Sequence, residues 1–179
     1  TSSTRFHIKG GKIYGGPVWD YDLSSGNCND DYYYDYNKYT DNNINENKSY
    51  EDLWATNVPW FYRLMKNSTF QSLVKERYLE LQDDIVNLYA DNINGQNRID
   101  YYLDTYEGTI DRNHNEAGWR VDKVHHSSMQ LERDPDKTYE EHIAFYRHWL
   151  EKRNEWLLEK WGLDSEVTAK NSKYSTLNG

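Results

Sequence analysis

A pair of adjacent glycines near the start of the chain limits the fold more than any other feature. Gly10-Gly11 separates two short stretches that alternate polar and apolar residues, 5–9 (RFHIK) and 12–14 (KIY). Two glycines supply the positive φ angles of a two-residue primed turn, so the sequence predicts a β-hairpin. The later periodic segments have helical spacing, and a parallel sheet would need several more strands. We therefore predict an α+β fold that is mostly helical.

The longest helical pattern covers about 20 residues after Ser68. Its apolar positions are Phe70, Leu73, Val74, Tyr78, Leu81, Ile85, Leu88 and Tyr89. Ser68 with Gln71 forms a capping-box pattern at the start, and Asn94-Gly95 is a typical helix end. The sequence predicts one continuous helix here.

Four further helices are predicted around this one. A short helix is expected over 49–55 with Ser49 as N-cap, and another begins at Val58-Pro59. A third covers 96–113 and a fourth runs from Thr138 to Gly162, a good C-cap residue. In the 96–113 helix, the residues expected to face inward are Ile99, Tyr102, Leu103, Tyr106 and Ile110.

The 179 residues suit a single domain. Its predicted parts are a hairpin over 4–20, a motif over 15–27, a polar Tyr/Asn-rich loop over 28–48, helices over 49–162 and a flexible tail over 163–179. The net charge of −9 argues against a general nucleic-acid binder. No apolar run approaches the roughly 20 residues of a membrane span. Cys28 is the only cysteine, which excludes an internal disulfide framework and a cysteine-rich zinc site.

The stretch that follows the hairpin carries the candidate chemistry. If residues 18–23 (VWDYDL) are extended, Trp19 lies on one face while Asp20 and Asp22 share the other. Two neighbouring carboxylates repel unless one is protonated or a cation lies between them. A hard divalent cation such as Mg²⁺, bound together with phosphates, would offset this repulsion. The competing interpretation is a strand end whose aspartates are solvated or cap a turn. Asn27 is the third candidate metal ligand.

The same region resembles the CotH kinase family, which is named after a spore-coat protein and has many secreted bacterial members. Residues 12–23 (KIYGGPVWDYDL) match its G-P-x-W-D-[FY]-D signature, and Gly26-Asn27 follow. Further matches lie at 60–65, at Phe70 with 74–78, and at 149–157 (WLEKRNEWL). Together they span about residues 5–162. The first signature is specific, whereas the helical matches mainly reflect packing.

The resemblance implies an atypical protein kinase that uses ATP with Mg²⁺ or Mn²⁺ to phosphorylate protein Ser/Thr. The helical part then resembles the C-terminal lobe of such a kinase. Asp20 and Asp22 become metal ligands, and Trp19 either borders the nucleotide or lies in the core. A location outside the cell, or on a cell or spore surface, is implied for a bacterial protein.

A kinase also needs a nucleotide-covering lobe, a phosphate-binding Lys and a catalytic Asp, and these precede such a hairpin. None can be placed here, since only four residues precede the first strand. We therefore expect the missing N-terminal portion of the same domain to be a partner. Residues 1–179 alone, with no catalytic residue of their own, are predicted to be inactive.

Two other functions remain open. The first is a non-catalytic surface module that binds carbohydrate or protein through the tyrosines of 32–39 (YYYDYNKY). The second is a nucleotide-sugar transferase, in which a D-x-D motif also holds a metal and a diphosphate. It ranks lowest, because no βαβ pattern surrounds the motif.

Overall fold

The computed structural model describes residues 5–17, 49–51, 53, 59–113, 139–165 and 167. The chain forms two compact units, residues 1–49 with 125–132 and residues 50–124 with 133–179. The described part of the first unit is a β-hairpin, and that of the second is helical.

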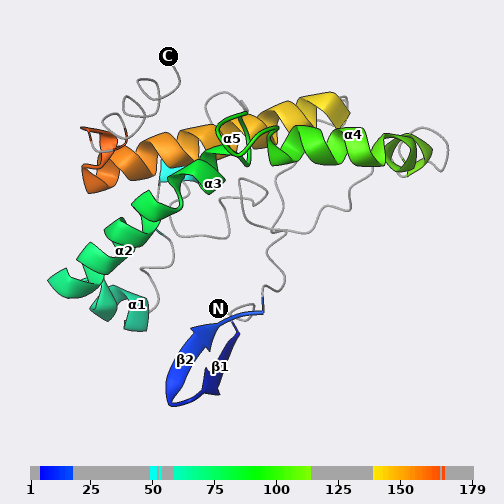
Figure 1. Cartoon of the computed structure of the whole chain (residues 1–179). Coiled ribbons are helices and arrows are strands. Elements are labelled where there is room, and N and C mark those ends of the chain that lie inside the picture. Colours follow the sequence, from blue (N-terminus) through cyan, green and yellow to red (C-terminus); the bar gives the residue numbers. More distant parts are fainter. Residues whose placement is uncertain are drawn as a thin grey trace. The chain divides into compact units, whose positions relative to one another are not determined.

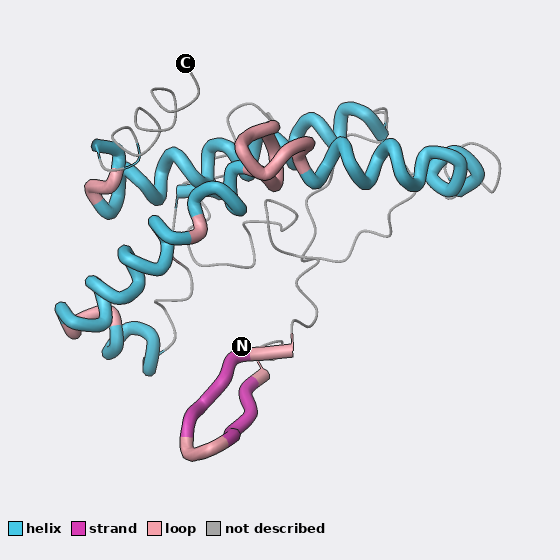
Figure 2. The backbone as a smooth tube through the Cα atoms, in the orientation of Figure 1, coloured by secondary structure: helices cyan, strands magenta, loops and turns pink. Residues whose placement is uncertain are grey.

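The predicted hairpin is confirmed. Strands β1 (Phe6–Lys9) and β2 (Lys12–Gly15) pair antiparallel, drawn in magenta in Figure 2. Gly10 and Gly11 have φ angles of 58° and 73°, the conformation that glycine adopts without steric cost. Because Ile8 pairs with Ile13, the apolar side chains share one face of the ribbon. On the other face the rings of His7 and Tyr14 stack at 5.2 Å.

The second unit contains the helices, as Figure 1 shows. They follow in the order η2 (Ser49–Glu51), α1 (Pro59–Leu64), α2 (Ser68–Glu80), α3 (Gln82–Val86), α4 (Arg98–Asp111) and α5 (Tyr139–Trp161). One hairpin followed by helices confirms the predicted α+β class with helices dominant. Pro59 occupies the first position of α1, where its missing N–H costs no hydrogen bond.

The longest predicted helix is interrupted, so the prediction of one continuous element was wrong. Leu81 (φ −89°, ψ 1°) separates α2 from α3. The predicted capping box at Ser68 and Gln71 was also wrong. The N-cap is Asn67, whose side chain accepts a hydrogen bond from the N–H of Phe70 at 3.0 Å. Asparagine is among the strongest N-cap residues, so the helix begins at Ser68, one residue earlier than the Ser68 pattern predicts.

Helix α4 buries a narrower stripe than its sequence suggests. Ile99 is buried, but the Tyr102 and Tyr106 side chains are 54% and 52% exposed, so their predicted inward orientation was wrong. These two rings stack on each other at 6.0 Å instead. Tyr106 also leaves helical geometry (φ −112°, ψ 15°), two residues before Gly108.

Helix α5 is the axis of the helical unit. It ends at Trp161, and Gly162 (φ 67°) follows at the predicted helix end. From its first residue to its last, α5 contacts the earlier helices in reverse order. Arg147 donates to Asp100 of α4, and Asn154 accepts from Gln82 of α3. Near the end of α5, the carbonyl of Trp161 accepts from Lys75 of α2. The long helix therefore runs against the direction of the α2–α3–α4 path (Figure 1).

The apolar core among the described residues is thin. It comprises Ile99, Phe145, Leu157, Leu158 and Leu163, with buried polar residues interspersed. Five buried residues are polar: Gln82, Asn87, Asn97, His142 and Asn154. Within the described residues no helix has the length and apolar character needed to cross a membrane. The helices are held together to a large extent by polar contacts.

Candidate functional site

The residues predicted to form the metal site lie outside the described residues. This applies to Trp19, Asp20, Asp22 and Asn27, and also to the tyrosine-rich segment 32–39. The structure describes the chain that leads to them: β2 ends at Gly15, the N–H of Gly16 donates to the carbonyl of Arg5 at 2.9 Å, and the Gly16–Pro17 peptide is cis.

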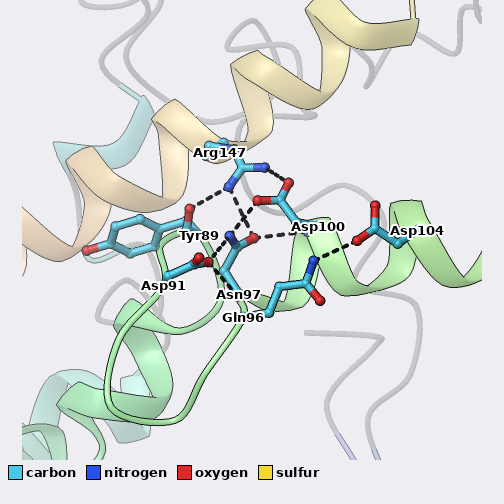
Figure 3. Close-up of polar contacts among 7 residues, drawn as sticks. All are labelled: Tyr89, Asp91, Gln96, Asn97, Asp100, Asp104 and Arg147. Atoms are coloured by element: carbon cyan, nitrogen blue, oxygen red, sulfur yellow. Dashed lines mark hydrogen bonds and ion pairs between the residues drawn. The ribbon is translucent and has the colours of Figure 1, made fainter.

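The described residues contain a polar cluster at the start of α4, shown in Figure 3. Asn97 is its centre and is 3% exposed. Its side-chain oxygen accepts from the N–H of Asp100 at 2.9 Å, which makes it the N-cap of α4. Its side-chain NH₂ donates to the carboxylates of Asp91 and Asp100, each at 2.6 Å. One amide thus fixes the helix start and joins it to the preceding turn.

Arg147 of α5 completes this cluster. Its guanidinium donates to the carbonyl oxygen of Tyr89 at 2.6 Å, to Asn97 Oδ1 at 3.1 Å and to Asp100 Oδ1 at 2.5 Å. The planar guanidinium suits several acceptors in one plane. The Asp100 carboxylate also lies in the first turn of α4, where the helix dipole favours a negative charge. The contacts fasten α4 to α5 at this point.

The hydrogen bonds of this cluster lower the pKa values of its two carboxylates, which fits a structural role. Hydrogen bonds from the backbone and side chain of Asn97 lower the pKa of Asp91. The pKa of Asp100 is lowered first by the Asn97 side chain and then by Arg147. Both carboxylates therefore stay ionised, and N–H donors occupy Oδ1 of Asp91 and both oxygens of Asp100. Among the described residues, no group of three or more His, Cys, Asp or Glu side chains could hold a metal ion.

A second polar cluster lies one heptad further along α5. Asn154 and Gln82 are both buried, and their amides face each other: Gln82 Nε2 donates to Asn154 Oδ1 at 3.1 Å, with a longer return contact of 3.4 Å. The hydroxyl of Tyr78 donates to the same oxygen at 2.7 Å. Asn154 Nδ2 donates to the hydroxyl of Tyr89 at 3.1 Å. The buried amides are therefore satisfied.

Tyr89 joins the two clusters. Its carbonyl oxygen accepts from Arg147 and its hydroxyl accepts from Asn154, residues seven apart on one face of α5. Sequence reasoning missed this arrangement because the partners of Arg147 and Asn154 lie far away in sequence. Two signals could have found it: the Asn97-x-x-Asp100 cap pattern, and polar residues at Arg147 and Asn154 within an otherwise apolar stripe.

Because Tyr78 is partly buried, we expect the free energy of unfolding to depend on its ionisation at alkaline pH. Burial raises the pKa of Tyr78 from 10.0 to about 12. Its stabilising contribution is therefore fully present below pH 10 and is lost as the pH rises toward 12, because the unfolded chain ionises first. We expect a loss of about 1 kcal/mol across this window, since partial exposure screens the ring. Urea unfolding at several alkaline pH values should show a shallower pH dependence for Tyr78→Phe than for Tyr62→Phe, an exposed control. Equal slopes would contradict the assignment.

Arg153 of α5 contacts η2. Its guanidinium donates to the carbonyl of Tyr50 at 2.5 Å and lies 5.2 Å from the centre of the Trp156 ring. The hydrogen bond to Tyr50 connects η2 with α5. Lys160 approaches the same ring at 5.8 Å.

Comparison with known proteins assigns this chain to a family. The sequence model of the CotH kinase protein family matches residues 3–157, most of the chain. No curated protein and no solved structure matched. The matched region includes the hairpin, the W-D-Y-D motif and all but the end of α5. This protein belongs to the CotH kinase family.

Proposed function

We propose that this chain supplies the metal- and nucleotide-binding motif of a CotH-type protein kinase. In this proposal Asp20 and Asp22 bind Mg²⁺ or Mn²⁺ together with the phosphates of ATP. Asn27 contributes a further ligand and Trp19 borders the nucleotide. The reaction is transfer of the γ-phosphoryl group to a Ser or Thr of a protein substrate.

The observation that carries the proposal is the family match over residues 3–157, which includes the G-P-x-W-D-Y-D motif. The described hairpin supports it, since β2 leads directly into that motif. Carboxylate and amide oxygens are also the donor set that Mg²⁺ prefers. The polar clusters of α4 and α5 serve as scaffold, because hydrogen bonds already occupy their carboxylates.

The residues of this chain would act by binding and orientation. A divalent cation in such a site neutralises charge on the transferring phosphoryl group. Asp20 and Asp22 hold the cation where the polyphosphate can reach it, and the acidic pair keeps its charge because the cation offsets the mutual repulsion. Loss of both carboxylates therefore removes the metal rather than reshaping the fold.

The test is phosphotransfer by the longest natural polypeptide that contains this sequence. With Mg²⁺–ATP or Mn²⁺–ATP, mass spectrometry should detect phosphoserine or phosphothreonine on the polypeptide or on added acceptor proteins. We expect Asp20→Ala/Asp22→Ala to lower the rate by about 100-fold or more. Asp30→Ala/Asp31→Ala is the matched control, since it removes the same charge from the same region and should retain the rate.

Equal rates in both double variants would contradict the proposal. A parent polypeptide that neither binds ATP nor transfers phosphate, but loses carbohydrate or protein binding when the tyrosines of 32–39 are changed, would favour the surface-module alternative instead. We further propose a protein substrate outside the cell or on a cell or spore surface. The family membership supports this proposal.

A further inference from the structure

A tight turn between α3 and α4 contains an Asn-Gly step, the dipeptide most prone to spontaneous deamidation. The turn consists of residues 92–95, with Asn94 and Gly95 at its end. In the reaction, the backbone nitrogen of Gly95 attacks Cγ of Asn94 and loses its proton. The Cγ–Nδ2 bond breaks and ammonia leaves. Water then opens the resulting succinimide to aspartate or isoaspartate.

The attacking nitrogen is held by the fold. The N–H of Gly95 donates to the carbonyl of Asn92 at 2.9 Å, and the N–H of Asn92 donates to the carbonyl of Gly95 at 3.2 Å. Asn87, which is buried, donates through its side chain to the Gly95 carbonyl at 3.0 Å. Gly95 has a φ of 94°, which residues with a Cβ rarely adopt. The Gly95 nitrogen can attack Asn94 only after its hydrogen bond to the Asn92 carbonyl breaks.

The reacting side chain is held as well. Asn94 Nδ2 donates to the carboxylate of Asp84 at 3.0 Å, and the N–H of Asn94 donates to Asn92 Oδ1 at 2.9 Å. Asn92 in turn donates from Nδ2 to the carbonyl of Asp83 at 2.6 Å, which fastens the turn to α3. A side-chain amide that donates to a carboxylate keeps its NH₂ group occupied and its position fixed.

We propose that Asn94-Gly95 is a deamidation site that the fold protects. The folded turn suppresses deamidation of Asn94, and deamidation in turn removes the hydrogen bond from Asn94 to Asp84 that helps to hold the turn. The product places a carboxylate at the position from which Asn94 now donates to Asp84. Two carboxylates at this distance repel, so the hydrogen bond becomes a repulsion. Reaction therefore proceeds through local opening of the turn and, once complete, favours the open state.

The test compares deamidation rates at Asn94 by peptide mapping and mass spectrometry in mildly alkaline buffer. In the folded chain we expect a rate at least about tenfold below that of the urea-unfolded chain. Asn92→Ala removes both side-chain bonds that fix the turn and should bring the folded rate close to the unfolded one. Asp84→Ala removes only the anchor on Asn94 and should give an intermediate rate. Glu76→Ala, which removes an exposed carboxylate from α2, is the control and should leave the rate unchanged.

Circular dichroism of each variant verifies that it is folded, and Asp84→Ala keeps the test decisive if Asn92→Ala unfolds. A second measurement addresses the product: Asn94→Asp should unfold at lower urea concentration than Asn94→Ala at neutral pH, and the gap should close in acid. Equal rates at Asn94 in the folded and unfolded chain would overturn the proposal. So would equal rates in Asp84→Ala and Glu76→Ala.

Discussion

Replacement of Arg147 by alanine is expected to destabilise the helical unit by about 2 kcal/mol or more. The change removes three donors at once, from the carbonyl of Tyr89, from Asn97 Oδ1 and from Asp100 Oδ1. The Arg147 side chain is 32% exposed and that of Asp100 is 42% exposed, so water compensates for part of the loss. The lost hydrogen bonds to the part-buried Tyr89 and Asn97 acceptors account for the rest.

Urea unfolding followed by circular dichroism measures this loss. Arg98→Ala is the matched control, since it removes the same charge from the exposed side of α4 and should cost only a few tenths of a kcal/mol, about the usual range for a surface change. Arg147→Lys should lie between the two, because lysine keeps the charge but loses the planar fork. Similar stabilities for Arg147→Ala and Arg98→Ala would contradict the role assigned to this cluster.

Replacement of Asn154 by leucine should cost about 3 kcal/mol, although the two side chains have similar volumes. Gln82, which is 2% exposed, would lose both contacts with its amide partner, and the hydroxyls of Tyr78 and Tyr89 would each lose one hydrogen bond. A buried polar group left without its partner costs its full desolvation penalty. The apolar gain from leucine does not offset this cost.

A double-mutant cycle isolates the amide pair. Gln82→Met/Asn154→Leu removes both amides with shapes preserved, so the double variant should be more stable than the sum of the two single changes predicts. The expected coupling energy is about 1 kcal/mol or more. Additive single effects would show that the two amides do not stabilise each other.

The secondary structure could be predicted where a local rule decides it. Gly10-Gly11 predicts the hairpin turn, Pro59 predicts the start of α1, and Gly162 predicts the end of α5. The structure confirms all three predictions. The break at Leu81 could not be predicted, because the apolar spacing continues through it and the contact of Gln82 with Asn154 of α5 lies 72 positions away in sequence.

It was harder to predict which side chains face inward than to predict where the helices lie. The apolar stripe at helical spacing predicts that Tyr102 and Tyr106 face inward, whereas both are exposed. The contacts that fasten α5 come instead from Arg147 and Asn154, whose partners on α3 and α4 depend on tertiary structure. The predicted site stays a prediction, since Trp19, Asp20, Asp22 and Asn27 lie outside the described residues.

The most direct measurement of the central claim is calorimetric titration of ATP into the longest natural polypeptide that contains this sequence, with Mg²⁺ or Mn²⁺ present. The account predicts saturable binding that needs the metal, that disappears in Asp20→Ala/Asp22→Ala and that persists in Asp30→Ala/Asp31→Ala. Binding that is unchanged in the first double variant, or a folded polypeptide that binds neither metal nor nucleotide, would contradict it.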